Sequence, residues 1–205
     1  MLTIPESRPR AGQRRPRSVR TAILKAARRL YLAEGVEGVS ARKIAREVGC
    51  SPTAIYLYYR SIADLLEHLR MEGHGLLAGH LRDASRTSGA IECLRAMGRA
   101  YHRFGRDHPA FYALMFSLRP AEMPGRAAVQ REMQTLFIVR DVVAAGMAAG
   151  ELRRGDATVV ANALWAQVHG VTALAVSGLL FETAPGHDQD VLETVLESAL
   201  TRLRP

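Results

Sequence analysis

The sequence predicts an all-α fold of about nine helices, with a small basic N-terminal part and a larger helical body. Three observations lead to this prediction. Apolar residues recur at three- and four-residue steps from about residue 18 onward. No window shows sustained two-residue alternation of strand-forming residues. Gly, Pro, Ser and Asp interrupt the pattern where helices would begin and end. At 205 residues and 48% hydrophobic composition, the chain is long enough to bury a sizeable core.

The chain begins with a basic arm. Residues 1–16 are rich in Arg and Pro, and such a composition cannot build a packed core. We therefore expect residues 1–16 to be flexible. Ser18 is positioned to cap the first helix, and Gly35 to end it.

Two short helices follow the first one. Ser40 caps a helix that Gly49 ends in the left-handed conformation, and a third helix of about eight residues comes next. Two such helices joined by a short turn with glycine form a helix-turn-helix unit, here about residues 40–59. Ala45 is small, as the crossing of the two helices requires. The shared apolar seam consists of Ile44, Val48 and Ile55.

The remaining helix starts are also marked. The third helix begins at Ser51–Pro52, since Pro is favoured in a first helical turn. Ser61 with Asp64 three residues later resembles a capping box, the start of a long fourth helix. Helices are expected at roughly 62–84, 90–107, 109–117, 126–149, 157–180 and 188–203.

The positive charge lies at one end of the chain. The net charge is +8, yet residues 1–60 hold 13 Lys+Arg against 4 Asp+Glu, and residues 61–205 hold 15 against 16. A basic end on a neutral body is typical of a protein that binds a polyanion. A solvated basic tail without a partner would have the same charge distribution.

Three tyrosines are concentrated in the third helix. Ile55 and Tyr59 are four residues apart and should face the apolar seam, whereas Thr53, Tyr56 and Leu57 fall on the opposite side. Tyr56 and Tyr58 could offer hydroxyls to DNA phosphates, although either could also be a core residue. Thr53 and Leu57 could meet thymine methyl groups, and Arg42 could reach a guanine.

The segment "SARKIAREVGCSPTAIYLYYRSIADLL" resembles the DNA-binding part of the TetR family of bacterial transcriptional regulators. The resemblance covers residues 17–77. It implies a sequence-specific regulator of double-stranded DNA, and it implies that Ile62 replaces a phosphate-contacting lysine, with Arg60 as the candidate substitute. The candidates for DNA contact are Ser40, Arg42, Lys43, Ser51, Thr53, Tyr56, Leu57, Tyr58 and Arg60.

Residues 78–205 have the length and helix content of that family's ligand-binding and dimerisation domain. Trp165, His169 and Gly170 resemble a subgroup marked by Trp, His and Gly. The resemblance implies a cytoplasmic homodimer, a repressor released from a palindromic operator by a small-molecule effector. An activator, or a DNA-binding architectural protein without a ligand, remains an alternative.

Aromatic residues and Met at helical spacing in the larger part are candidates for an effector pocket, and such residues also form ordinary cores. Trp165 and His169 could equally be pocket or core. Arg140 shares a face with apolar residues, so it could recognise an acidic ligand or pair with a carboxylate. The pocket candidates are Met97, Tyr101, Phe104, His108, Tyr112, Phe137, Arg140, Trp165 and His169.

The last two helices carry more apolar surface than one small body can cover, which predicts a four-helix dimer interface. The interface candidates are Leu164, Val168, Val171, Val191, Val195 and Ala199. Residues 159–181 carry no formal charge and could span a bilayer by length. Internal polar residues and the lack of flanking aromatic or basic belts favour a buried helix, so no membrane partner is expected.

Other functional classes lack their sequence signals. No H-E-x-x-H, G-x-S-x-G or phosphate-binding glycine loop occurs, and the seven histidines do not cluster. Cys50 and Cys93 have no metal-ligand spacing, and the N-terminus has no secretory signal. We therefore expect no catalysis, no metal and no cofactor.

Overall fold

The computed structural model describes residues 16–117, 133–181 and 184–205, and nine α-helices with no strand make up the regular structure of these residues. This confirms the all-α prediction. The chain forms two compact units, Met1–Leu66 and Glu67–Pro205. The division falls inside α4 (Ile62–Ala84), earlier than the boundary expected after residue 77.

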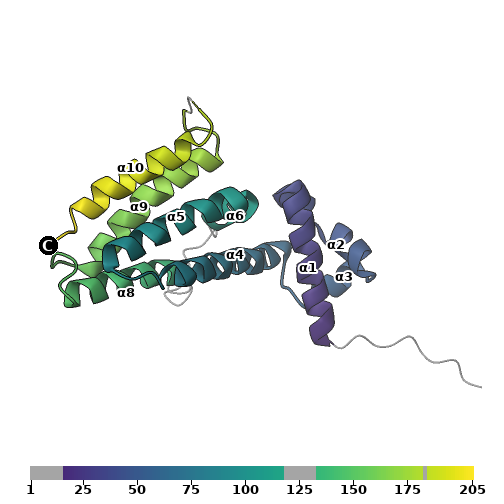
Figure 1. The fold of residues 1–205 in the computed structure, drawn as a ribbon. Coiled ribbons are helices and arrows are strands. Elements are labelled where there is room, and N and C mark those ends of the chain that lie inside the picture. Colours follow the sequence, from purple (N-terminus) through teal and green to yellow (C-terminus); the bar gives the residue numbers. More distant parts are fainter. Residues whose placement is uncertain (1–15, 118–132, 182–183) are drawn as a thin grey trace, which may run out of the picture. The chain divides into compact units, whose positions relative to one another are not determined.

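The first unit contains a helix-turn-helix (Figure 1). Its elements are α1 (Pro16–Glu34), the 3₁₀ turn η1 (Val36–Gly38), α2 (Ala41–Val48), α3 (Pro52–Ile55) and the start of α4. The prediction that Ser18 caps the first helix was wrong, because α1 begins at Pro16 and includes Ser18. A proline is well suited to that first position, since its missing N–H would have no helical partner.

The third helix is shorter than predicted. Only Pro52–Ile55 is α-helical. The next amides of Tyr56, Leu57 and Tyr58 donate to carbonyls three residues back, over 3.0–3.3 Å, which is the tighter 3₁₀ pattern. The tight turn ends at Tyr59, whose ring is only 2% exposed and whose hydroxyl donates to the carbonyl oxygen of Arg20 in α1 at 3.2 Å.

The packing of α2 on α3 follows the sequence pattern. Ile44, Ala45 and Ile55 are at most 1% exposed, which confirms the small residue at the crossing and two of the three seam residues, while Val48 is half-buried. Gly49 has φ 76°, so it ends α2 in the left-handed region where a side chain would be strained.

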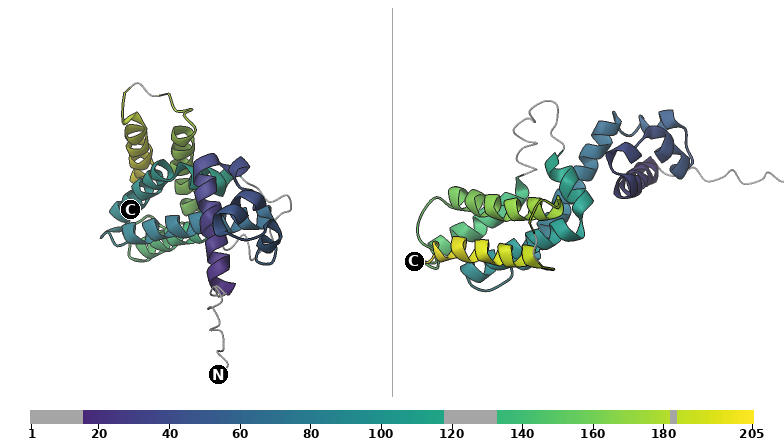
Figure 2. Two further views of the ribbon diagram at one scale, coloured as in Figure 1. Left: turned by 90° about the vertical axis from the view of Figure 1, so that its right-hand side faces the viewer. Right: turned by 90° about the horizontal axis from the view of Figure 1, so that it is seen from above.

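The second unit is a helical bundle (Figures 1 and 2). Besides most of α4 it contains α5 (Ala90–Asp107), α6 (Pro109–Ser117), α8 (Gln134–Ala148), α9 (Ala157–Val176) and α10 (His187–Thr201). α9 packs against α5, α8 and α10. The helix expected from residue 126 is seen from Gln134 onward, and its predicted first residues lie outside the described part of the chain.

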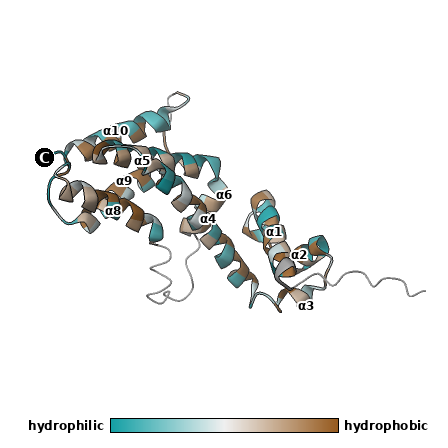
Figure 3. Ribbon diagram, turned by 60° about the horizontal axis from the view of Figure 1, so that its bottom comes forward, coloured by the Kyte–Doolittle hydropathy of each residue, from teal (hydrophilic) through white to brown (hydrophobic). Residues whose placement is uncertain are grey.

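Close packing brings α5 and α10 together. Leu192, Leu196 and Leu200 of α10 are at most 2% exposed. A side chain at Gly98 of α5 would begin only 2.7 Å from Cδ2 of Leu196, so the glycine is a notch that admits this leucine. Hydrophobic residues are most prominent along α8 and α9, while α10 shows hydrophilic residues along its length (Figure 3).

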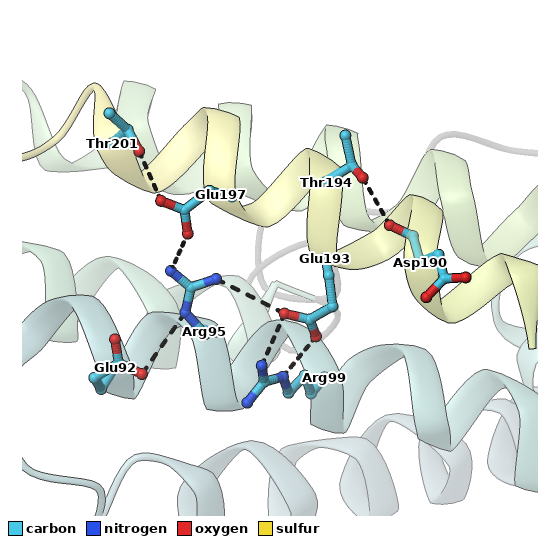
Figure 4. A network of polar contacts seen from close by, with 8 residues as sticks. All are labelled: Glu92, Arg95, Arg99, Asp190, Glu193, Thr194, Glu197 and Thr201. Carbon is cyan, nitrogen blue, oxygen red and sulfur yellow. Dashed lines mark hydrogen bonds and ion pairs between the residues drawn. The ribbon is translucent and has the colours of Figure 1, made fainter.

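A network of ion pairs also joins α5 to α10 (Figure 4). Arg99 holds the carboxylate of Glu193 with two hydrogen bonds of 2.6 and 2.8 Å. Arg95 lies 2.6 Å from Glu197 and 3.7 Å from Glu193. The four-residue spacing of the arginines thus matches that of the glutamates on the antiparallel neighbour.

Among the described helices, α9 alone is long and apolar enough to cross a membrane by length and composition, with a mean hydropathy of 1.4 over its best window. One such helix is weak evidence, since core helices of soluble proteins have the same composition. The contacts of α9 with three other helices agree with a place in the bundle.

Candidate functional site

The outer side of α2 and α3 presents the residues predicted to contact DNA. Tyr56 is 50% exposed and Leu57 is 80% exposed, and Arg42 and Thr53 are exposed as well. Tyr58 is half-buried. Tyr59 lies in the core as predicted, so the three neighbouring tyrosines divide into one exposed, one partly exposed and one buried side chain.

Three of the other candidates have bonds within the protein. The Oγ atom of Ser40 accepts a hydrogen bond from the amide of Lys43 at 3.3 Å, and that of Ser51 accepts from the amide of Ala54 at 3.2 Å. Both serines therefore cap helices, and each hydroxyl can still donate its hydrogen to another partner. Lys43 Nζ lies 2.5 Å from Glu34, an ion pair between α2 and α1.

The start of α4 holds Arg60 beside a reciprocal cap. Ser61 Oγ accepts from the amide of Asp64 at 3.0 Å, and Asp64 Oδ2 accepts from the amide of Arg60 at 2.9 Å. The predicted capping start is thus confirmed. In a standard capping box the Asp64 carboxylate would accept from the amide of Ser61, and here it accepts from the amide of Arg60, one residue earlier. The side chain of Arg60 is exposed, whereas that of Ile62 is half-buried.

The second unit contains an apolar cavity of about 40 Å³. Of the twelve described residues that line it, nine have no polar side-chain atom and none carries a charge. Met97, Tyr101 and Trp165 are the pocket candidates among them. The sequence prediction missed Thr135 and Val139 on α8, because it selected mainly aromatic residues and Met as pocket candidates.

A polar cluster lies at one wall of the cavity. The Tyr101 hydroxyl oxygen is 2.9 Å from His169 Nδ1 and accepts a 3.3 Å hydrogen bond from Trp165 Nε1. The Tyr112 hydroxyl lies 2.8 Å from the same Nδ1 atom and 3.3 Å from the carbonyl oxygen of His169. The Phe116 ring packs edge-on against His169 at 4.6 Å. Tyr112 and His169 are thus behind Tyr101 and do not line the cavity.

Burial controls the protonation of this cluster. It raises the pKa of Tyr101 to about 12 and raises the pKa of Tyr112 further still, so both phenols keep their hydrogens. Burial also lowers the pKa of His169, which favours the neutral ring at pH 7. The cluster therefore offers hydrogen bonds without a charge.

The remaining pocket candidates do not line the cavity. Arg140 pairs with Asp141 at 2.7 Å, and its guanidinium lies over the ring of Phe137, 4.7 Å from the ring centroid. Of the two alternatives for Arg140, the structure therefore shows pairing with a carboxylate of the protein. The Phe104 ring is 1% exposed and packs against His108, with ring centroids 5.2 Å apart.

The dimer candidates on α9 face the core of the chain itself. Leu164, Val168 and Val171 are 6–7% exposed and belong to the chain's own core, and Leu164 and Val168 also line the cavity. Val191, Val195 and Ala199 are partly buried against the same core. The exposed residues of α9 are Thr158, Val159, Asn162, Ala163, Ala166, Gln167 and Leu174.

A buried polar cluster that the sequence did not reveal joins α5, α9 and α10. His102 is 3% exposed and Asp188 is fully buried, and Nε2 of the histidine lies 2.8 Å from Oδ2 of the aspartate. Arg106 donates to the same oxygen. In the described residues, no group of three or more His, Cys, Asp or Glu is arranged to hold a metal ion.

Two family models match the chain. The model described as "Bacterial regulatory proteins, tetR family" matches residues 23–69, and the model described as "Tetracyclin repressor-like, C-terminal domain" matches residues 94–203. An HTH-type transcriptional regulator of Mycobacterium tuberculosis is 30% identical over 159 residues. This match covers 72% of the chain and 66% of the relative, so the chain spans slightly less than two thirds of the relative's length.

Solved structures share the fold. A protein of unknown function from Rhodococcus sp. RHA1 is 28% identical with a TM-score of 0.80, over 91% of this chain and 96% of that one. The regulator FadR from Bacillus subtilis, solved in complex with stearoyl-CoA, is 18% identical with a TM-score of 0.69, over 90% of this chain and 99% of that one. At 18% identity the second likeness concerns the fold alone.

Proposed function

The chain belongs to the TetR family of bacterial transcriptional regulators, which bind DNA, and from this premise we propose that it is a cytoplasmic homodimeric repressor. It binds a palindromic operator and leaves it when a small molecule occupies the cavity of the second unit. The observation that carries the proposal is the exposure of Tyr56 and Leu57 beside the buried Ile55 and Tyr59. A folding role would bury these side chains, whereas a role in binding requires them at the surface.

The exposed residues divide by chemistry. Arg42 can donate two hydrogen bonds to a guanine, while Thr53 and Leu57 can contact thymine methyl groups, so these three would read sequence. Tyr56, Tyr58 and Arg60 would bind phosphates and set the position of the protein on the duplex. Ser40 and Ser51 support the two helices, and each hydroxyl hydrogen could still reach a phosphate.

Palindromic recognition needs two copies of the unit. A two-fold dimer places its recognition elements on half-sites about one helical turn apart, roughly 34–36 Å. The exposed face of α9, with α10 beside it, is the surface we assign to dimerisation. A groove of about 290 Å³ between these helices, lined in part by Ala163, Gln167, Ser198 and Arg202, would receive side chains of the second copy.

The effector would act through α4. This helix carries Leu81 on the cavity and begins with the Ser61–Asp64 cap of the first unit, so one continuous element belongs to both units. The Bacillus subtilis neighbour was solved with stearoyl-CoA, which supports the capacity of this fold to hold a small molecule.

The test is fluorescence anisotropy with labelled DNA from upstream of the protein's own gene, in physiological salt with random-sequence competitor. Binding that survives the competitor supports a sequence-specific regulator, and its loss on adding a cavity ligand supports release. A ligand-independent architectural protein would bind the competitor equally well and would not respond to any ligand.

A further inference from the structure

The cavity is unsuited to an ion. None of its described lining residues carries a charge, and nine of the twelve have no polar side-chain atom. A carboxylate or ammonium group that entered it would lose its water without gaining a counter-charge, which costs several kcal/mol. Arg140, the charged candidate on α8, is already paired with Asp141.

Three lining residues can nevertheless donate a hydrogen bond, Tyr101, Thr135 and Trp165, and Tyr101 is the one that belongs to the polar cluster around His169. His169 Nδ1 offers a single hydrogen-bonding position in either neutral tautomer, yet two tyrosine hydroxyls lie within 2.9 Å of it. The hydroxyls of Tyr101 and Tyr112 also contact each other. When Nδ1 pairs with Tyr112, or carries the hydrogen itself, Nδ1 does not take the hydroxyl hydrogen of Tyr101, which can then turn to a molecule in the cavity. Trp165, which also lines the cavity, donates to Tyr101 only over a long 3.3 Å contact.

We propose that the effector is an uncharged, mainly apolar molecule with one oxygen acceptor, such as a ketone or an alcohol, which takes the hydroxyl hydrogen of Tyr101. The proposal rests on the proposed function for the choice of site. It adds the chemical class of the ligand and the residue that selects it. Tyr101 is suited to this role because it is 5% exposed and held by two neighbours.

The cavity is too small for a ring-sized ligand unless side chains around it move. A volume of about 40 Å³ holds about three water molecules, so a ring-sized ligand has to displace side chains. Met97 is in the lining, and its unbranched thioether adapts to irregular spaces at low cost. The ligand therefore gains apolar contacts on the side of Met97 and keeps one polar contact at Tyr101.

Trp165 makes the test direct, because it is the single tryptophan of the chain and lines the cavity. The purified full chain, without DNA, is titrated with four compounds that share one ring: cyclohexanone, methylcyclohexane, cyclohexanecarboxylate and cyclohexylammonium. Binding is followed by Trp165 emission and by calorimetry. We expect cyclohexanone to bind at least about tenfold more tightly than either ion.

The Tyr101→Phe variant removes the selecting hydroxyl. It should weaken cyclohexanone about three- to tenfold, the effect of one hydrogen bond, and leave methylcyclohexane unchanged. The matched control is Tyr31→Phe, since Tyr31 is another tyrosine with 5% exposure but lies in the first unit. Circular dichroism checks the fold of both variants. If Tyr101→Phe does not fold, the affinity of the unmodified chain for cyclohexanone relative to the two ions still tests the proposal.

Three results would overturn the proposal: an ion that binds as tightly as the ketone, equal effects of the two Phe variants on the ketone, or no binding of any compound by both readouts. The proposed release from DNA is judged separately. A ketone that binds as expected but does not release the operator contradicts the release mechanism alone. A charged compound that releases the operator from within this cavity contradicts the ligand class alone.

Discussion

His102 Nε2 lies 2.8 Å from Asp188 Oδ2, while the other ring nitrogen, Nδ1, lies 3.2 Å from Thr172 Oγ1. Thr172 donates its own hydrogen to the carbonyl oxygen of Val168 at 2.7 Å, so its oxygen can only accept from His102. A carboxylate likewise only accepts. The ring of His102 therefore bridges Thr172 of α9 and Asp188 of α10.

The first prediction concerns this bridge. Asp188→Asn should lower the free energy of unfolding by about 3 kcal/mol, because it removes the buried carboxylate that both Arg106 and His102 contact. Urea unfolding followed by circular dichroism measures the loss. Asp190→Asn is the control, since Asp190 is exposed on the same helix and should change stability by no more than about 0.5 kcal/mol. Equal losses in the two variants would contradict a special role for Asp188.

The second prediction concerns acid. Burial alone would raise the pKa of Asp188, but the hydrogen bonds and charges of Arg106 and His102 outweigh it and hold that pKa below the ordinary value of 3.8. A carboxylate with a lowered pKa stabilises the fold above its unfolded pKa and loses this contribution as the pH falls. The stability difference between the unmodified chain and Asp188→Asn should therefore shrink as the pH falls below about 4. Urea unfolding at a series of pH values tests this, and a constant difference down to low pH would contradict it.

The third prediction separates two neighbouring tyrosines. Tyr59→Phe should cost about 1 kcal/mol of stability, because the carbonyl oxygen of Arg20 loses its donor. Tyr56→Phe should leave the unfolding curve unchanged and weaken DNA binding about two- to tenfold on all sequences, as expected for a lost phosphate contact. Urea unfolding and DNA anisotropy on both variants check the pair. If Tyr56→Phe lowered stability and Tyr59→Phe weakened only DNA binding, the assigned roles of the two tyrosines would be wrong.

The fourth prediction concerns base recognition. Arg42→Ala should reduce the discrimination at one operator base pair by about 1–3 kcal/mol. Competition between the operator and its single-base variants measures this. Arg82→Ala removes the same charge from an exposed position in the second unit and is the control for general electrostatic loss. If Arg42→Ala weakens all sequences equally, the residue binds phosphate and does not read a base.

The fifth prediction concerns the assigned dimer face. Ala163→Glu places a charge on the exposed side of α9 and should yield monomers with normal helix content, measured by light scattering and circular dichroism. Leu164→Ala, one residue further on, empties a core position and should instead lower stability by about 2–5 kcal/mol. Dimers that persist with Ala163→Glu would place the interface elsewhere.

Much of the first unit could be predicted from the sequence, because its signals are local. Ser40, Ser51 and Gly49 lie where caps are needed, and all three have the expected conformation or bond. The length of the third helix could not be predicted. The four-residue spacing of Ile55 and Tyr59 predicts an α-helix, and nothing in the sequence marks the tightening to 3₁₀ bonds at Tyr56–Tyr58.

The faces of α9 were beyond prediction for a different reason. This helix is apolar on most of its circumference, so its periodicity does not distinguish the core face from the exposed face. Leu164 and Val168 were therefore assigned to the dimer although they line the cavity. The pair of His102 and Asp188 gave no signal either, because 86 residues separate its members.

The buried leucines of α10 have a further consequence. Leu192, Leu196 and Leu200 recur at four-residue steps, so a slide of α10 by about one helical turn would bring another leucine to the notch at Gly98. Apolar packing is thus nearly degenerate between the alignments. The same slide would part Asp188 from His102 and break one of the two Arg–Glu pairs of Figure 4. The leucines hold α10 against α5, and the charged pairs decide which of the nearly equivalent axial alignments α10 adopts.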